Sequence, residues 1–321
     1  GSSVACAAAM GRIAVPQMLK YNYAPTLATG SVAAGGTLGA LIPPSILLIL
    51  FGIFTETSIN LLFIASIGVG VFSAVSYVVM IVIRTWLNPE LAPPVDDRPS
   101  WRERITALSE VWPVLVLFGI VLGGMFAGIF TATEAGAVGA FMTILISFFK
   151  RTLTFSALKD TLVETLSTTA SLFFIAIGAS LFIRFLTFAG TDDLIAEIIL
   201  QLGTDRIVLI LGLVGVYLVM GMFIDPLGTM LLTIPLVMPV LDKLDIPMVW
   251  FGVFLVKMLE IGMITPPIGL NVFVLKTVVP RDITLGIIFK GVMWFIIIDI
   301  LVVLLMIFFP QLVLFLPGFA Q

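Results

Sequence analysis

The sequence of 321 residues has no histidine, one cysteine (Cys6) and no Gly-Lys pair. It therefore cannot form an intrachain disulfide, a zinc site built from His and Cys, or a P-loop for ATP. Charged residues make up only 11% of the chain, with a formal net charge of −3. No basic stripe of the kind that follows nucleic-acid phosphates is present. We expect no organic cofactor and no nucleic-acid partner.

The chain is instead rich in long apolar segments. Hydrophobic residues make up 60% of it and the mean hydropathy is +1.22, against roughly 45–50% apolar residues in soluble domains. Residues 61–83, 207–223 and 283–309 approach or exceed the ~20 residues that cross a bilayer. The sequence predicts an all-α polytopic membrane protein. The expected spans are 25–54, 59–83, 111–129, 134–149, 160–189, 248–276 and 283–309.

Two segments do not fit single crossings. Residues 1–11 are short, and residues 206–241 are interrupted at Asp225-Pro226, so both are interpreted as re-entrant hairpins. Alternating the loops then leaves only Arg206 and Lys243 on one side, which predicts that the other, basic side is cytoplasmic. That side collects Arg12, Lys20, Arg84, Arg98, Arg102, Arg104, Lys150, Arg151, Lys159, Lys276, Arg281 and Lys290. Arg184 and Lys257 fall inside spans.

A Gly-x-x-x-Pro-Pro pattern occurs twice, ending at Pro43-Pro44 and at Pro266-Pro267, each about halfway along a span. Adjacent prolines interrupt a helix, at ~3 kcal/mol or more each in a helix interior. Each broken span follows a hairpin, and the charge pattern gives the two units opposite orientations. Inverted repeats with paired Gly/Pro interruptions are typical of transporters with a binding site at the membrane midplane. A structural kink is the alternative for either break alone.

This pattern divides the chain into four parts. They are a first repeat (1–83), a cytoplasmic linker (84–110), connecting helices (111–205) and a second repeat (206–321). Within the linker, Ser100 and Glu103 form a capping-box pattern, which predicts a short interfacial helix from Trp101. Because the sequence begins Gly-Ser-Ser without Met and becomes apolar at once, we expect it to start partway through a longer protein.

A broken helix exposes groups that bind ions. The carbonyls before the breaks, among them those of Gly39, Ile42, Gly262 and Thr265, can coordinate a dehydrated Na⁺. The half-helices that are expected to begin at the second proline of each pair direct a positive N-terminal end toward the midplane, which favours a carboxylate.

Several motifs together resemble the large membrane subunit of TRAP (tripartite ATP-independent periplasmic) transporters. They are Gly-Ser-Ser at the start, Gly39-x-Leu-Ile-Pro-Pro-Ser45, Thr133-Glu-Ala, Asp225-Pro-x-Gly-Thr229 and Glu260-Ile-Gly-x-Ile-Thr-Pro-Pro-Ile-Gly-Leu-Asn271. The resemblance covers essentially the whole chain, with the N-terminal part of the family missing. It implies an elevator-type, Na⁺-coupled importer of carboxylates such as C4-dicarboxylates or sialic acids in the bacterial inner membrane. It also implies two partners, a small membrane subunit and a periplasmic binding protein.

Two sets of candidate site residues follow from the breaks and the resemblance. The substrate set is Ser2, Ser3, Ser45, Arg184, Asp225, Thr229 and Asn271. The sodium set is Gly39, Ile42, Pro44, Gly221, Gly228, Gly262, Thr265 and Pro267.

Simpler roles are open for several of these residues. Asp225 before a proline is a standard helix N-cap, and Ser or Thr hydroxyls also join neighbouring helices. Arg184 lies near a span end, where it can extend to the interface. Lys257 and Glu260 are spaced i,i+3 and are expected to pair with each other.

Two further acidic residues in spans, Glu134 and Asp299, are interpreted as structural or subunit-facing. As for the function itself, proton coupling and, less favoured, an ion channel are the alternatives. An enzyme is not expected, because the two aspartate motifs of intramembrane aspartyl proteases are absent.

Overall fold

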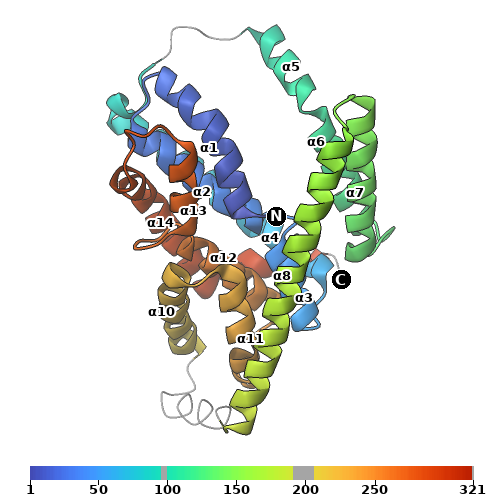
Figure 1. The fold of residues 1–321 in the computed structure, drawn as a ribbon. Coiled ribbons are helices and arrows are strands. Elements are labelled where there is room, and N and C mark those ends of the chain that lie inside the picture. The colour runs from blue at the N-terminus through green and yellow to red at the C-terminus, as the bar shows by residue number, and fades with distance from the viewer. Residues whose placement is uncertain (95–99, 191–205, 320–321) are drawn as a thin grey trace. The chain divides into compact units, whose positions relative to one another are not determined.

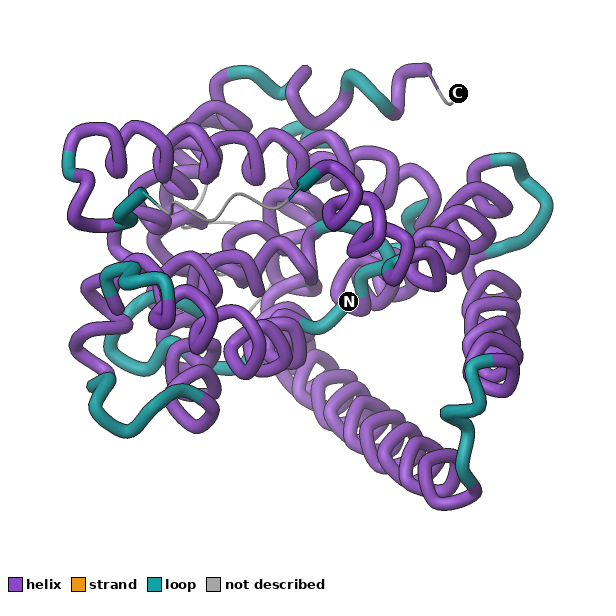
Figure 2. Tube along the Cα trace, turned by 90° about the horizontal axis from the view of Figure 1, so that it is seen from above, coloured by secondary structure: helices purple, strands orange, loops and turns teal. Residues whose placement is uncertain are grey.

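The computed structural model describes residues 1–94, 100–190 and 206–319, and every regular element in these ranges is a helix (Figure 2). The α-helices are α1 (Ser3–Lys20), α2 (Pro25–Leu41), α3 (Ile46–Phe54), α4 (Ile59–Leu87), α5 (Trp101–Glu110), α6 (Trp112–Phe126), α7 (Ala132–Phe149), α8 (Phe155–Phe188), α10 (Arg206–Phe223), α11 (Pro226–Lys243), α12 (Met248–Gly262), α13 (Leu270–Val278), α14 (Leu285–Phe308) and α15 (Gln311–Leu314). Two short 3-10 helices are η1 (Pro89–Leu91) and η2 (Pro317–Phe319). The all-α prediction is confirmed.

Seven helices of the described chain are long and apolar enough to cross a membrane, if α2 and α3 are taken together as Pro25–Phe54. The chain is a multi-pass membrane protein. Both α10 and α11 are among the seven, and 18 residues extend for about 27 Å. Length and composition would thus allow each to cross, and the re-entrant character of this segment stays a prediction.

The chain forms two compact units. The first comprises Gly1–Pro94 and Phe182–Gln321, and the second Val95–Leu181 (Figure 1). In the second unit, α5 starts at Trp101 behind the capping box of Ser100 and Glu103, as predicted. A second capping box joins Thr131 to Glu134 at the start of α7, which gives Glu134 the structural role expected for it.

Helix contacts in the first unit occur in matching pairs. Helix α1 packs against α2 and α13, while α11 packs against α12 and α3. In the same way, α2 packs against α14 and α12 packs against α4. Each arm, α1 or α11, therefore contacts its own broken helix and the second half of the other one.

The second hairpin is antiparallel. The turn between α10 and α11 consists of Ile224 and Asp225, and the Tyr217 hydroxyl donates to the Thr233 hydroxyl oxygen across it at 3.0 Å. The first hairpin arm differs from the prediction of 1–11, because α1 continues through Pro16 to Lys20.

Both predicted helix breaks are present. Residues 42–45 separate α2 from α3, and residues 263–269 separate α12 from α13, with a cis bond between the two prolines in each. The half-helices begin later than predicted, so Pro44 and Pro267 are not their first residues. Helix α3 starts at Ile46 because the Ser45 hydroxyl caps it, accepting from the Leu48 N–H at 3.3 Å.

Glycine permits the corresponding start of α13. Gly269 precedes this helix with a left-handed φ of 57°, a conformation that residues with a side chain rarely adopt.

The predicted orientation can be tested by cysteine labelling. Single cysteines at Lys159 on α8 and at Asp245 in the turn after α11 should react with impermeant reagents from opposite sides, Lys159 from the cytoplasm. A cysteine at Thr57 should behave like the one at Asp245. Labelling of Asp245 from the cytoplasm would make the second hairpin a crossing and would contradict the inverted arrangement.

Candidate functional site

A cavity of about 140 Å³ lies where both hairpins and both helix breaks meet. The start of α1 and the turn of the second hairpin contribute residues 1–4 and 225–227. The end of α2 and the start of α3 contribute Ala40, Ile46 and Leu47. The end of α12 and the start of α13 contribute Glu260, Met263 and Leu270. Four segments that are far apart in sequence thus surround one space.

Three of the predicted substrate residues line this cavity, namely Ser2, Ser3 and Asp225. Ser2 also caps α1, and Ser3 is buried. Asp225 is the N-cap of α11, and its carboxylate accepts from the N–H groups of Leu227 at 2.9 Å and Gly228 at 3.0 Å. The capping role proposed for Asp225 is confirmed, and its exposed position at the turn leaves a second role open.

Three further substrate candidates lie beside lining residues without lining the cavity themselves: Ser45, Thr229 and Asn271, all with 0% exposure. The Thr229 hydroxyl and both polar side-chain atoms of Asn271 have no hydrogen-bond partner among the described residues. Such buried unpartnered groups are rare in folded proteins. Arg184, the remaining candidate, is exposed on α8 and does not line the cavity.

The glycines of the predicted sodium set take part in close packing. A Cβ atom on Gly221 would lie 2.9 Å from the Gly262 Cα, so α10 and the end of α12 meet backbone to backbone. A Cβ atom on Gly39 would lie 3.3 Å from the Cys6 side chain on α1. A Cβ atom on Gly228 would meet the Asp225 carboxylate at 3.1 Å.

The other members of the sodium set lie in or next to the breaks. Ile42 is extended at the end of α2, and Pro44 and Pro267 are exposed. The Thr265 hydroxyl donates to the Ile261 carbonyl at 2.6 Å. None of the set lines the cavity, so their role in sodium binding stays a prediction.

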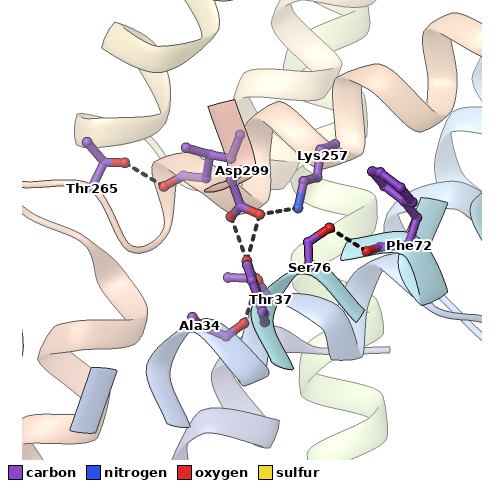
Figure 3. Close-up of polar contacts among 9 residues, drawn as sticks. Ala34, Thr37, Phe72, Ser76, Lys257, Thr265 and Asp299 are labelled. Carbon is purple, nitrogen blue, oxygen red and sulfur yellow. Dashed lines mark hydrogen bonds and ion pairs between the residues drawn. The ribbon is translucent and has the colours of Figure 1, made fainter. Parts of the chain in front are cut away.

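The expected pair of Lys257 and Glu260 is wrong. Lys257 pairs with Asp299 on α14 at 2.5 Å (Figure 3). The Tyr77 hydroxyl lies 2.7 Å from both Asp299 oxygens. Asp299 therefore has the structural role predicted for it. Within the described part of the chain, Glu260 has no hydrogen bond on either carboxylate oxygen, although it is 1% exposed.

Sequence reasoning missed Glu260 as a cavity residue. A signal was available in the charge count. Lys257, Glu260 and Asp299 lie at membrane depth in spans, and one lysine cannot neutralise two carboxylates.

Comparison with known proteins decides the family. The model of the DctM component of tripartite ATP-independent periplasmic transporters matches residues 1–312. The chain belongs to this family. Its members are transporter permease components, so this DctM-family chain is not an enzyme.

Named relatives agree with the assignment. The C4-dicarboxylate TRAP transporter large permease protein DctM of Pseudomonas aeruginosa is 34% identical over 99% of this chain and 74% of its own length. The sialic acid TRAP transporter large permease protein SiaM of Vibrio cholerae is 31% identical over 99% and 73%. The 2,3-diketo-L-gulonate TRAP transporter large permease protein YiaN of Escherichia coli is 32% identical over 84% and 63%.

The glycine contact gives a prediction for this DctM-family chain. Gly221→Ala should lower the free energy of unfolding by about 1–3 kcal/mol, because the methyl group meets backbone that cannot move aside. Uptake should fall with it, since the contact joins the hairpin to the broken helix. Gly215→Ala on the same helix is the control, because no atom of the described residues lies within 4 Å of its added Cβ. Thermal unfolding that is equal for the two variants would contradict the prediction.

Proposed function

We propose that the protein is the large permease subunit of a transporter that imports small organic anions together with Na⁺. In this proposal it lies in the bacterial inner membrane with a small membrane subunit, and a periplasmic binding protein delivers the substrate. The observation that carries the proposal is the single cavity shared by the two hairpins and the two helix breaks. Binding at such a junction is typical of transporters with repeated units.

The proposed mechanism is an elevator-type movement built on an inverted repeat. The paired contacts of α1 and α11, and of α2 and α12, support two equivalent units. The N-terminal ends of α3 and α13 lie at the cavity through Ile46 and Leu270, where helix dipoles favour an anion. Backbone oxygens of the breaks would hold sodium.

The substrate class rests on the chemistry of these helix ends and on the relatives. Relatives are named for C4-dicarboxylates, sialic acid and 2,3-diketo-L-gulonate. We propose a carboxylate for this chain as well. The unpartnered side chains of Thr229 and Asn271 are suited to a substrate or an ion, because binding would supply the missing hydrogen bonds.

Uptake into proteoliposomes tests the proposal. The complete complex is reconstituted, and C4-dicarboxylates, sialic acid and 2,3-diketo-L-gulonate are offered with the binding protein under separately imposed sodium and proton gradients. We expect saturable uptake that requires the inward sodium gradient. Uptake driven by the proton gradient alone would favour the proton-coupled alternative. Flux that neither saturates nor shows counterflow would favour a channel.

A further inference from the structure

Glu260 is a buried carboxylate at the cavity, and no described residue forms an ion pair with it. The residue is 1% exposed on α12, lines the cavity, and neither of its oxygens accepts a hydrogen bond. The Ser3 hydroxyl lies beside it, yet no hydrogen bond of ordinary length and angle joins the two. Buried charges are normally paired, hydrogen-bonded or bound to a metal ion.

The nearest lysine does not compensate this charge. Lys257 lies one turn before Glu260, but its ammonium is held by Asp299 at 2.5 Å (Figure 3). The Tyr77 hydroxyl donates to the same carboxylate. With Glu260 ionised, the three side chains of Lys257, Asp299 and Glu260 would together carry one net negative charge. A single positive charge at Glu260 would balance it.

Among the residues that the structure describes, Lys257 is the one lysine or arginine that acts on Glu260. The cavity lining includes a second carboxylate, Asp225, and no basic side chain. The α-amino group of Gly1 is nearby and counts as a positive charge only where the chain begins at Gly1. In the described chain, the charged and titratable groups around Glu260 are thus Lys257, Asp299, Tyr77, Asp225 and the Gly1 amine.

We propose that Glu260, with the Ser3 hydroxyl, binds a monovalent cation, Na⁺, at this cavity. Carboxylate and hydroxyl oxygens suit a hard cation, and one carboxylate balances one positive charge. The site differs from the backbone-oxygen sites at the helix breaks, because its main ligand is a side chain. The inference rests on the proposed sodium coupling. A bound sodium ion would neutralise the negative charge of Glu260 in the cavity wall, and this would favour the binding of an anionic substrate there.

Direct binding of radioactive sodium to the purified protein in lipid nanodiscs tests the site. Glu260→Gln keeps the shape of the side chain and removes its charge, so sodium bound per protein should fall by one ion, or the affinity of one site by more than tenfold. Glu103→Gln is the control, because glutamine preserves the capping box at an exposed position. Equal sodium binding by Glu260→Gln and the unmodified protein would overturn the proposal.

A second variant acts without changing Glu260. Asp299→Asn releases Lys257, which is spaced i,i+3 from Glu260 and can pair with it. Sodium binding should then fall as it does in Glu260→Gln. Sodium binding that persists in Asp299→Asn would contradict the charge balance on which the site rests.

The sodium site can also be tested on the unmodified protein. Sodium chloride should raise its unfolding temperature above that in choline chloride of equal ionic strength, because a bound ion stabilises the folded state. The absence of any difference would also overturn the site. Sodium-dependent uptake with unaltered binding in Glu260→Gln would refute this site and leave the proposed function intact. Glu260-dependent binding with sodium-independent uptake would refute the coupling and leave the site.

Discussion

Replacing Lys257 by methionine should lower the free energy of unfolding by about 3–5 kcal/mol, the usual cost of breaking a buried ion pair from one side. Methionine fills a similar volume, so packing changes little. The cost arises because Asp299, 1% exposed, loses its cation while the Tyr77 hydroxyl alone remains against it. Unfolding of the purified protein, followed by denaturant or heat, measures the effect.

Two comparisons separate the charge effect from general damage. Lys243→Met, at an exposed position in the last turn of α11, should change the free energy of unfolding by under about 1 kcal/mol. The triple variant Lys257→Met, Asp299→Leu and Tyr77→Phe removes all three polar groups and should recover most of the loss, since apolar replacements of buried pairs are often neutral. A triple variant less stable than Lys257→Met would show that the polar cluster itself stabilises the fold.

The helix breaks and the cap at Asp225 were predictable from sequence because their causes are local. Two adjacent prolines remove two backbone donors wherever they stand, and a proline after Asp225 fits the first position of a helix. The start of α3 was misplaced by two residues for an equally local reason. The Ser45 hydroxyl caps the helix, so its first helical residue is Ile46 and not Pro44.

Contacts between distant segments were not predictable in the same way. Lys257 and Glu260 are near in sequence and form a plausible i,i+3 pair, but the partner of Lys257 comes from α14, 42 residues away. Proximity along the chain predicted the wrong pair because it cannot show which faces of α12 and α14 pack together. A cavity shared by the two repeats was predictable only from the repeated helix breaks. Glu260 was not among the residues predicted to lie at it.

Close helix packing at glycines was also not predictable from their spacing in the sequence. Gly119 and Gly123 have the Gly-x-x-x-Gly spacing that is typical of close helix packing, yet nothing in the described chain lies within 4 Å of a Cβ added to either. The close approaches occur instead between single glycines of separate helices. These are Gly221 with Gly262, and Gly30 on α2 with Gly291 on α14.

The contact of Gly30 with Gly291 gives the second large expected effect. A Cβ on Gly30 would lie 2.6 Å from the Gly291 carbonyl oxygen, and a Cβ on Gly291 would overlap the Thr26 carbonyl oxygen. Backbone lies on both sides, so no side chain can rotate away and the two helices must separate. We expect Gly291→Ala to lower the free energy of unfolding by about 3 kcal/mol, the upper end of the usual cost of overpacking.

The control for this prediction lies on α2 itself. Gly35→Ala adds the same methyl group five residues after Gly30, where no atom of the described chain lies within 4 Å of the added Cβ. It should leave stability unchanged or raise it by about 0.5–1 kcal/mol, because alanine favours the helix. If Gly30→Ala and Gly291→Ala unfold like Gly35→Ala, α2 and α14 are not in backbone contact. A loss confined to the Gly30 and Gly291 variants would instead confirm that α2 and α14 pack backbone to backbone at this contact.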